Sequence, residues 1–358
     1  MLTLKVRRGR DITYLTRDEA RELDGLRAGP ALRWLRGDGD LSRSSDVEAL
    51  LTSTPRSRVV GYDVILAAPR PISILLALDE ASAPGVVRAH QRSVDAAMEY
   101  LEERALVVRD RRGGEDRDRP GRWAQMVAFT HGINRHGEPH LHDHVLVGAR
   151  PRGESRVVDS RSLFAHLLTA DALYRSSLRA GVARETGYQP WRSFEGREHV
   201  EGLDEGYRVL WGGHHADRGE KHHWGREEAR RRWRADLARF EPHVLVPAPT
   251  RHRDRIDEHA FAAAFEGRLS VGRRHLVRAW ADAAVFGAEA REVDCCVDLL
   301  HPNLARSRGV REDVVSVTEA RATALVRERG PRPLTTGELE LWRQRSVVRS
   351  RDGVERSR

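Results

Sequence analysis

Alternating apolar and polar positions mark the segments of the chain that form strands. The apolar residues of segment 2–6 alternate with polar ones, which is typical of a half-buried strand. Residues 59–68, VVGYDVILAA, form an apolar run of strand length. Two further strand-like runs, 123–131 and 141–149, flank a stretch rich in turn residues, so the sequence predicts an antiparallel hairpin there.

Apolar residues at helical spacing mark the helices. A long helix is expected after Pro84, because apolar residues recur there on one helical face. The same spacing predicts a helix over 161–186, which Gly187 is placed to end, and a third helix over 226–240. The charged stretch 109–122, RDRRGGEDRDRPGR, predicts a solvated loop.

The chain divides near a Pro- and Arg-rich segment. Its 358 residues accommodate one large domain with an appendage, or two domains. Residues 246–255, VPAPTRHRDR, are the best linker candidate, because the composition changes from mixed strands and helices to helical beyond them. The last ten or so residues are predicted to be disordered.

The charge of the chain points to a polyanionic partner. Lys and Arg number 62 against 54 Asp and Glu, which gives a net charge of +8, and only Lys5 and Lys221 among the basic residues are lysines. Arginine suits phosphate recognition, because its guanidinium binds phosphate with two parallel hydrogen bonds. A nucleic acid is the partner that this composition favours.

Several classes of protein are excluded by what the sequence lacks. No apolar run approaches the ~20 residues of a membrane helix, so no membrane insertion is expected. The only cysteines, Cys295 and Cys296, are adjacent and poorly placed to bond to each other, which favours a reducing cytoplasm. Neither lysine follows a glycine, so a Walker A phosphate loop is absent.

A histidine-rich segment, HGINRHGEPHLHDH, begins at His131. Successive side chains of a strand point to opposite faces, so His142 and His144 share one face, and antiparallel pairing brings His131 beside them. Three neutral imidazoles predict a divalent-metal site with open positions, for which we expect Mg²⁺ or Mn²⁺, with Zn²⁺ as the alternative. His136 and His140 in the turn are less constrained substitutes. The competing interpretation is a scatter of histidines in a polar turn.

Two further residues stand out near this segment. Asp63 interrupts a buried strand, where a carboxylate needs a charged or hydrogen-bonding partner; a metal-ligating histidine is one candidate and an arginine is the other. Tyr14 precedes a predicted capping box formed by Thr16 and Glu19, a place suited to holding a phosphate beside a nucleophilic hydroxyl. A packing role for Tyr14 is the alternative.

The predicted helix over 226–240 is strongly basic. Arg230 and Arg234 could follow a phosphate backbone, and Trp233 between them could stack on a base. A solvated helix face with Glu–Arg pairs explains the same pattern equally well.

At these residues the sequence resembles the TrwC-type conjugative relaxases, the MobF class of the HUH endonucleases. The matching segments follow the family order along the chain: MLTLKVRRGRDITYLT at 1–16, RWLRGDGD at 33–40, GYDVILAAPRPIS at 61–73, FTHGINRHGEPHLHDHVLV at 129–147, LYRSSLRAGVARETGY at 173–188 and LWGGHH at 210–215.

The resemblance implies a metal-dependent enzyme that nicks single-stranded DNA at a transfer origin through a 5′-phosphotyrosyl intermediate and then transfers or reseals the strand. The family's nucleophile falls on Tyr14, its metal ligands fall on His131, His142 and His144, and its histidine-orienting aspartate falls on Asp63. The implied fold is α+β, with a central antiparallel sheet of about five strands flanked by helices and a C-terminal all-helical extension.

The resemblance also implies an organisation and partners. Residues 1–240 would form the catalytic domain, 241–302 a helical extension that closes over DNA, and 303–358 a basic tail, helical and partly disordered. The chain lacks the helicase of large family members, so a separate helicase and conjugation or secretion proteins are expected. Arg70 takes the place of a family lysine and is expected to contact DNA, whereas residues 22–34 lack a second tyrosine.

Two other functions remain open on the sequence. The chain could be a non-catalytic remnant that binds a hairpin origin without cutting it. It could also be a metal-dependent nuclease that uses water as its nucleophile.

Overall fold

The structure is a computed structural model in which part of the chain is described. The described residues are 1–12, 15, 32–36, 44–51, 58–112, 115–134, 136–203, 205–211, 226–238, 257, 261–262, 264–305, 307–310, 313–316 and 320. Tyr14, the capping box that follows it, the linker candidate 246–255 and the tail beyond residue 320 lie outside these residues.

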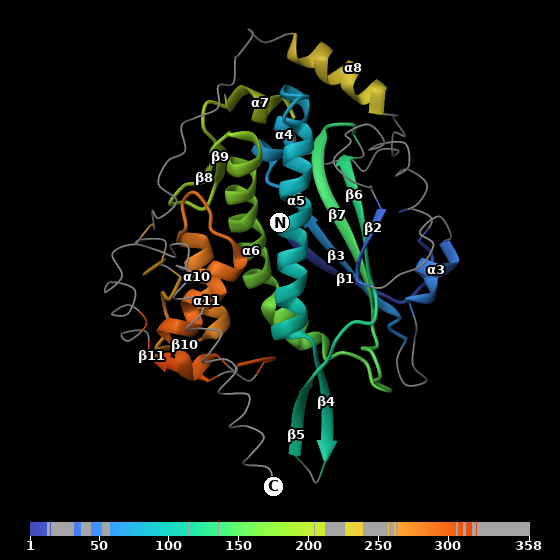
Figure 1. Cartoon of the computed structure of the whole chain (residues 1–358), viewed down its shortest axis with the longest axis vertical. Coiled ribbons are helices and arrows are strands. Elements are labelled where there is room, and N and C mark those ends of the chain that lie inside the picture. The colour runs from blue at the N-terminus through green and yellow to red at the C-terminus, as the bar shows by residue number, and fades with distance from the viewer. Residues whose placement is uncertain are drawn as a thin grey trace.

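A five-stranded antiparallel sheet forms the centre of the molecule (Figure 1). Its strand order is β1-β3-β7-β6-β2, and every neighbouring pair is antiparallel. The strands are β1 (Leu2–Arg7), β2 (Leu32–Arg36), β3 (Gly61–Ala67), β6 (Met126–Ile133) and β7 (Pro139–Gly148). The central antiparallel sheet of the predicted α+β fold is confirmed, as is the hairpin, now seen as β6 and β7.

Long helices cover one face of this sheet (Figure 1). They are α4 (Arg70–Leu78), α5 (Ala83–Tyr100) with its π-helical continuation η1 (Leu101–Ala105), and α6 (Ser160–Thr186). Gly187 ends α6 in a left-handed conformation (φ 76°) that suits glycine, as the sequence predicts. The helix pair α5 and α6 approaches closely where Gly181 faces Ala89, because a Cβ on Gly181 would lie 3.1 Å from that of Ala89.

The two faces of the sheet bury different sets of residues because side chains alternate along each strand. Toward α5 and α6, Tyr62, Val64 and Leu66 of β3 join the main core. On the opposite face, Val127, Phe129 and Leu146 pack in a smaller cluster, whose other members are Ile12, Leu15, Val47, Leu50, Leu51 and Val60. Helix α3 (Ser44–Ala49) belongs to this second face.

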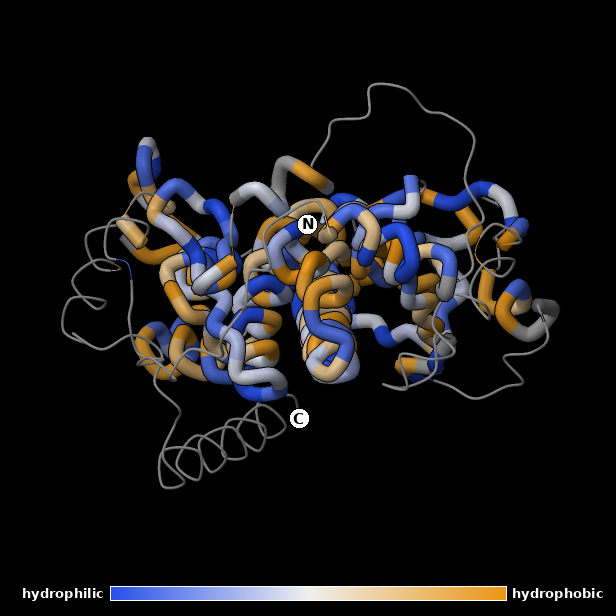
Figure 2. Tube along the Cα trace, turned by 90° about the horizontal axis from the view of Figure 1, so that it is seen from above, coloured by the Kyte–Doolittle hydropathy of each residue, from blue (hydrophilic) through white to orange (hydrophobic). Residues whose placement is uncertain are grey.

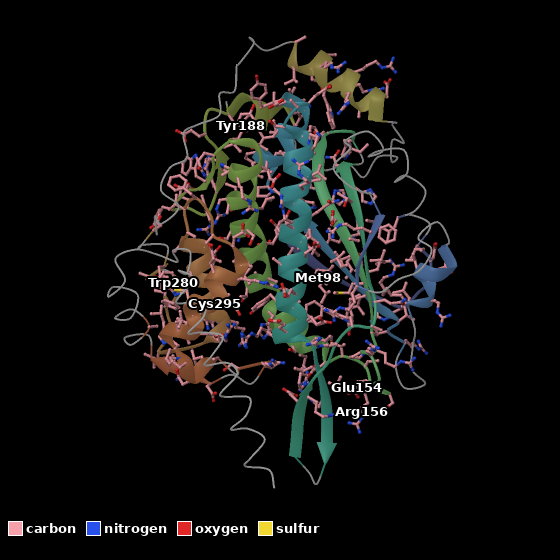
Figure 3. The ribbon with its side chains drawn as sticks, in the orientation of Figure 1. Met98, Glu154, Arg156, Tyr188, Trp280 and Cys295 are labelled. Atoms are coloured by element: carbon pink, nitrogen blue, oxygen red, sulfur yellow. The ribbon has the colours of Figure 1, made fainter. Side chains whose placement is uncertain are left out.

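Each helix presents both apolar and polar residues along its length (Figure 2). In α5, Val94, Ala97 and Met98 are fully buried, whereas Glu99 of the next turn is exposed. Figure 3 shows Met98 at the side of α5 that faces the sheet. The apolar face of α5 therefore forms the core, as its sequence pattern predicts.

The charged stretch over 109–122 forms a hairpin, and the predicted loop is wrong. Strands β4 (Val107–Arg112) and β5 (Glu115–Pro120) pair and extend from one end of the molecule (Figure 1). The register places an arginine opposite an acidic residue from Arg109↔Asp118 to Arg112↔Glu115. Val107 and Val108 are buried at the base of the arm, and Arg109 lies 2.7 Å from the Asp159 carboxylate.

Two short hairpin strands and two helices lead from α6 toward the extension. They are β8 (Pro190–Arg192), β9 (Glu198–Val200), α7 (Glu205–Leu210) and α8 (Arg226–Leu237). Beyond residue 240 the described part contains β10 (Ser270–Gly272), α10 (Arg273–Ala283), α11 (Ala290–Leu300), the 3₁₀ turn η2 (Pro302–Leu304) and β11 (Val314–Ser316), and we call this whole part the extension from here on. Within its described residues, the paired strands β10 and β11 are the one departure from an all-helical structure.

The extension shares the main core with the sheet and is fastened to α6 by ionic contacts. Leu276, Val277 and Trp280 of α10, the last labelled in Figure 3, belong to the same buried cluster as Leu2 and Leu4 of β1. Cys295 and Cys296 form no disulfide and are buried on α11.

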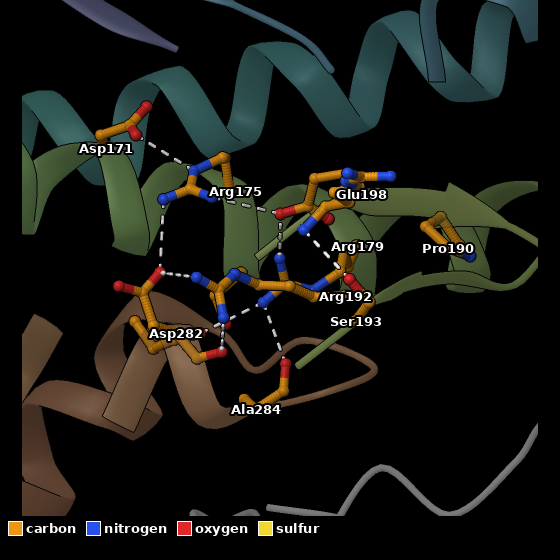
Figure 4. A network of polar contacts seen from close by, with 12 residues as sticks. Asp171, Arg175, Arg179, Pro190, Arg192, Ser193, Glu198, Asp282 and Ala284 are labelled. Atoms are coloured by element: carbon orange, nitrogen blue, oxygen red, sulfur yellow. Dashed lines mark hydrogen bonds and ion pairs between the residues drawn. The ribbon is translucent and has the colours of Figure 1, made fainter. Parts of the chain in front are cut away.

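A network of arginines and carboxylates joins α6, β9 and α10 (Figure 4). The fully buried Arg179 bonds Glu198 at 2.6 Å and donates to the backbone oxygens of Ala281 and Ala284 at 3.1 and 2.9 Å. Arg175 contacts Asp171, Glu198 and Asp282 at 3.1–3.4 Å. Buried charges are tolerated only when they are paired in this way.

A second ionic cluster joins the end of α5 to α11. Arg104 in η1 lies 3.2 Å from Asp294 and 3.4 Å from Asp298, and it donates to the backbone oxygen of Ala305 at 2.7 Å. The buried Arg273 contacts the same two carboxylates at 2.7 and 2.8 Å.

Among the described residues, no helix combines the length and the apolar character needed to span a membrane.

Gly287, in the turn between α10 and α11, should not tolerate a side chain. Its φ is +86°, and a Cβ there would lie 2.3 Å from the backbone oxygen of Ser176. We expect Gly287→Ala to lower the free energy of unfolding by about 3 kcal/mol or more, because it adds a clash to the strain. Gly153→Ala is the matched control, since Gly153 has φ +72° and nothing within 4 Å; it should cost only about 1–2 kcal/mol. Urea denaturation measures both, and equal losses would contradict the predicted clash.

His166 should make stability depend on pH. Burial, together with the nearby positive charges of Arg274, Arg273 and Arg104, lowers its pKa from 6.5 to about 4, although its hydrogen bond to the backbone oxygen of Gly309 at 2.8 Å acts in the opposite direction. Folding therefore favours the neutral ring, so stability is complete above pH 6.5 and falls as the pH drops toward 4.

The contribution of His166 should amount to about 2 kcal/mol between pH 7 and pH 5. Urea denaturation at both pH values measures it. In His166→Gln, whose side chain does not titrate, the decline should be shallower by this amount, and an unchanged decline would show that His166 does not carry it.

Candidate active site

Three histidines lie together on the face of the sheet opposite α5 and α6. His131 of β6 pairs directly with His142 of β7, and His144 follows two residues later on the same face. Their ring centroids are 5.0 Å apart for His131 and His142, 5.5 Å for His131 and His144, and 5.4 Å for His142 and His144. The strand period and the hairpin register thus bring together the three residues that the sequence singles out.

Asp63 holds the ring of His144. It lies on β3, the neighbour of β7, and its two carboxylate oxygens are 2.9 and 3.1 Å from His144 Nδ1. Because a carboxylate accepts, Nδ1 is the donor of this bond, and Nε2 is the ring nitrogen left to face a ligand. The carboxylate is 1% exposed, so a histidine receives the buried charge in this strand.

A backbone oxygen fixes His142 in the same manner. Nδ1 of His142 donates to the oxygen of His140 at 2.9 Å, which leaves Nε2 as the acceptor. Burial, reinforced by His140, His131 and His144, lowers the pKa of His142 well below its usual value. Burial likewise lowers the pKa of His140 to about 4. The rings of His140 and His142 are therefore neutral at neutral pH, and Nε2 of His142, which lies in the group of three histidines, is able to bind a cation.

The donor set fits a divalent metal ion, although the rings are not yet in coordinating orientations. Imidazoles bound about 2.0 Å from one ion have their centroids about 5 Å apart, close to the separations found here. His131 and His142 are stacked at 17°, however. Within the described part of the chain, no three His, Cys, Asp or Glu side chains are arranged as a complete ligand set. Binding an ion would require side-chain rotation.

Tyr14 lies outside the described residues, but its neighbours in the sequence are placed on the histidine face. Ile12 and Leu15 are 0% and 1% exposed, and Leu15 donates its backbone N–H to Ile12 at 2.8 Å. Both pack in the cluster that contains Phe129 and Leu146 of β6 and β7.

Arg70 supports the turn between β6 and β7. Its guanidinium donates to the backbone oxygen of Pro139 at 3.0 Å and lies 3.4 Å from the Glu138 carboxylate. Asn134 donates to the same carboxylate at 2.7 Å. The side chain of Arg70 remains 27% exposed, so part of it faces solvent beside the histidines' turn.

The basic helix α8 is placed differently from what its sequence suggests. Trp233 is 7% exposed and packs with Ile74 and Trp211, and its indole N–H donates to the backbone oxygen of Gly137 at 2.7 Å. Arg230 is 19% exposed and Arg234 is 65% exposed. Of the three predicted DNA contacts on α8, the structure presents Arg234 most fully to solvent.

The ion pairs of α8 agree with the solvated-face interpretation. Arg230 and Arg234 lie 3.8 and 2.5 Å from the Glu80 carboxylate. Glu228 pairs with Arg231 and Arg232 within the helix.

A buried polar cluster behind β7 is missed by the sequence interpretation. Asp143 projects to the opposite face from the three histidines, as its position predicts, and is fully buried. One oxygen is 2.9 Å from His90 Nε2 and the other 3.4 Å from Arg33. Burial alone would raise the pKa of Asp143, but His90, Arg33 and Thr130 together hold it below its usual value. Two features of the sequence could have indicated this cluster: the carboxylate of Asp143 in a buried strand, and His90 on the buried face of α5.

Comparisons with known proteins agree with this geometry. Residues 8–240 match the family model described as TrwC relaxase. The fold is similar to that of the conjugative relaxase TrwC in complex with OriT DNA. For a metal-bound structure the TM-score is 0.55, and for a copper-bound structure it is 0.52. Each shares 19% sequence identity and covers 67% of this chain and 98% of the other.

At this identity the solved structures establish the fold, and the family model establishes the family. A comparison with curated protein sequences gave no match. The family model spans well over half of the chain and includes four of the five sheet strands, β2, β3, β6 and β7, together with all three histidines and Asp63. The chain therefore belongs to the TrwC relaxase family and is a DNA relaxase.

Proposed function

We propose that this relaxase nicks one strand of DNA at a transfer origin by forming a covalent bond between Tyr14 and the cut strand. The observation that carries the proposal is the convergence of His131, His142 and His144 on one sheet face, with Asp63 bonded to His144 at 2.9 Å. Two buried neighbours of Tyr14 in the sequence lie on that same face.

The solved relatives support the choice of ligands. TrwC was solved in complex with OriT DNA in metal-bound and copper-bound forms. For the present chain we propose single-stranded origin DNA as the substrate and a divalent ion as the cofactor, with Mg²⁺ or Mn²⁺ favoured and Zn²⁺ as the alternative. His131, His142 and His144 would hold this ion, with Asp63 keeping the Nε2 lone pair of His144 directed away from β3.

The reaction follows from the groups at the site. A bound ion would supply positive charge beside the scissile phosphate and so stabilise the charge that develops there. The Tyr14 hydroxyl loses its proton and attacks phosphorus. The bond between phosphorus and the 3′ oxygen breaks, and that oxygen takes up a proton as the free 3′-hydroxyl. The phosphotyrosyl bond preserves the energy of the phosphodiester, so an incoming 3′-hydroxyl can reverse the step and rejoin a strand.

The surroundings of the site supply candidate contacts with the DNA backbone. Arg70 beside the turn and Arg234 on α8 each present part of the guanidinium to solvent. Arg230 and Arg234 both pair with Glu80 and would need to leave it, and Trp233 would need to leave its buried position, before they could bind DNA. Arg234 and Arg70 are the better-supported contacts because their side chains are more exposed than those of Arg230 and Trp233.

We also propose the wider organisation that the sequence suggests. Residues 1–240 would carry the chemistry, 241–302 would close over the DNA, and 303–358 would form a basic tail. A separate helicase would unwind the DNA, and conjugation or secretion proteins would act with the relaxase in the cytoplasm.

Replacing Tyr14 tests the nucleophile. The protein is incubated with Mn²⁺ and single-stranded oligonucleotides tiled across the DNA that flanks its gene, and the products are separated under denaturing conditions. The unmodified protein should form a covalent adduct whose peptide contains Tyr14. In Tyr14→Phe the adduct should fall by at least about a thousandfold, whereas Tyr188→Phe, which removes a hydroxyl bonded to Asp79, should retain it.

The products separate the alternatives. Cleavage without an adduct in both the unmodified protein and Tyr14→Phe would show that water is the nucleophile. Binding without cleavage in any metal would identify a non-catalytic remnant.

Replacing Asp63 tests its role toward the metal. Asp63→Asn keeps the size of the side chain but removes the charge that orients His144, so affinity for Mn²⁺ should fall about 10–100-fold. Titration calorimetry measures the affinity. Glu99→Gln is the control, because Glu99 is a half-exposed carboxylate of α5 that pairs with Arg291 and contacts neither the histidines nor Asp143 in the contacts described above. An affinity unchanged in Asp63→Asn would remove this residue from the proposed site.

A further inference from the structure

We propose that His90 and Asp143 are positioning residues: they hold β7 from behind so that His142 and His144 keep their places on the opposite face. This inference rests on the proposed function of the histidine face. It concerns the far side of the sheet, where neither residue can touch DNA or a metal ion, because Asp143, His90 and Tyr174 are all fully buried.

The position of Asp143 in the strand is the first argument. It is the residue between His142 and His144, and its side chain points toward α5 while theirs point away. A rotation of β7 about its own axis would therefore move the carboxylate and both imidazoles together. Whatever fixes the carboxylate also fixes the two histidines.

Both oxygens of that carboxylate are held, and by different elements. His90 of α5 holds Oδ1 at 2.9 Å, and Arg33 of β2 holds Oδ2 at 3.4 Å. Arg33 is itself bonded to Asp95 at 2.6 Å and to the backbone oxygen of Gln91 at 3.2 Å, both on α5. The carboxylate is thus tied both to α5, which covers this face of the sheet, and to β2, which lies beyond β6 in the strand order, and two bonds define its direction more closely than one would.

His90 is in turn held by α6. Its Nδ1 is 2.8 Å from the hydroxyl of Tyr174, with the two rings edge to face at a centroid separation of 5.7 Å. A chain of hydrogen bonds therefore runs from α6 through α5 to β7. An apolar core would fill this space at lower desolvation cost, so such a network is best explained by the orientation that it imposes.

The molecule contains a matched control for this network. Tyr100, the last residue of α5, and His166 of α6 form a second buried pair. The Tyr100 hydroxyl lies 2.8 Å from Nδ1 of His166, and the ring centroids are 5.7 Å apart. The other nitrogen of His166 bonds the backbone oxygen of Gly309 in the extension, not β7. His90 and His166 are both buried, and each ring makes two hydrogen bonds. Of the two, His90 is the one bonded to β7, the strand that carries His142 and His144.

The test compares His90→Phe with His166→Phe, with His90→Gln as the conservative variant that keeps a donor for Asp143. Ring-nitrogen NMR shifts of His142 and His144 are recorded in the metal-free protein, where they report geometry without requiring activity. Mn²⁺ affinity is measured by calorimetry, and kcat and KM by nicking of the oligonucleotide cut by the unmodified protein. Tyr174→Phe, which removes one hydroxyl, provides a milder variant if His90→Phe does not fold.

The proposal expects His90→Phe to shift both ring signals and to weaken Mn²⁺ binding about tenfold or more, with kcat lowered and KM unchanged. His166→Phe should alter neither, although both variants lose thermal stability, and His90→Gln should recover most of the affinity. Equal ring shifts in the two Phe variants, or none in either, would overturn it. If the unmodified protein neither binds Mn²⁺ nor nicks DNA, the proposed function fails while the ring shifts still decide the positioning role.

Discussion

In β7, the two-residue period of an extended strand assigns each side chain to one of two environments. His142 and His144 face the smaller cluster and Asp63, and Asp143 between them faces α5 and its buried partners. The same period in β3 and β6 supplies Asp63 and His131 to the first face. The candidate site and the core behind it therefore depend on the same pairing register of β7. A shift of β7 by one residue would move the histidines to the core face and Asp143 to the site face, so both arrangements would be lost.

The features that could be predicted from the sequence are those that depend on short-range periodicity. The hairpin carrying His131 and His142 needs only strand alternation and a turn, and α6 with its Gly187 cap needs only helical spacing. The burial of Trp233 depends on Gly137 and Ile74, which are distant in sequence, so its arginine neighbours do not reveal it. The arm formed by β4 and β5 depends on pairing between two strands, which the charged and turn-forming composition of the stretch does not indicate.

Arginine serves two purposes in this chain. The positive charge that points to a polyanion is carried by exposed residues such as Arg234. Other arginines are buried inside the protein. Arg179 and Arg273, each 1% exposed, bind carboxylates there and connect neighbouring elements. Net charge therefore overstates the positive surface available to DNA, because part of the arginine content is structural.

Helix α6 connects these regions along its length. At about 1.5 Å per residue its 27 residues span about 40 Å, and its Tyr174, Arg179 and His166 bond to groups of α5, β9 and the extension respectively. Elements bonded to a common rigid rod cannot lose their structure independently. The described parts of the sheet and the extension should consequently behave as one cooperative unit, in which local opening on either side is coupled to the other through α6.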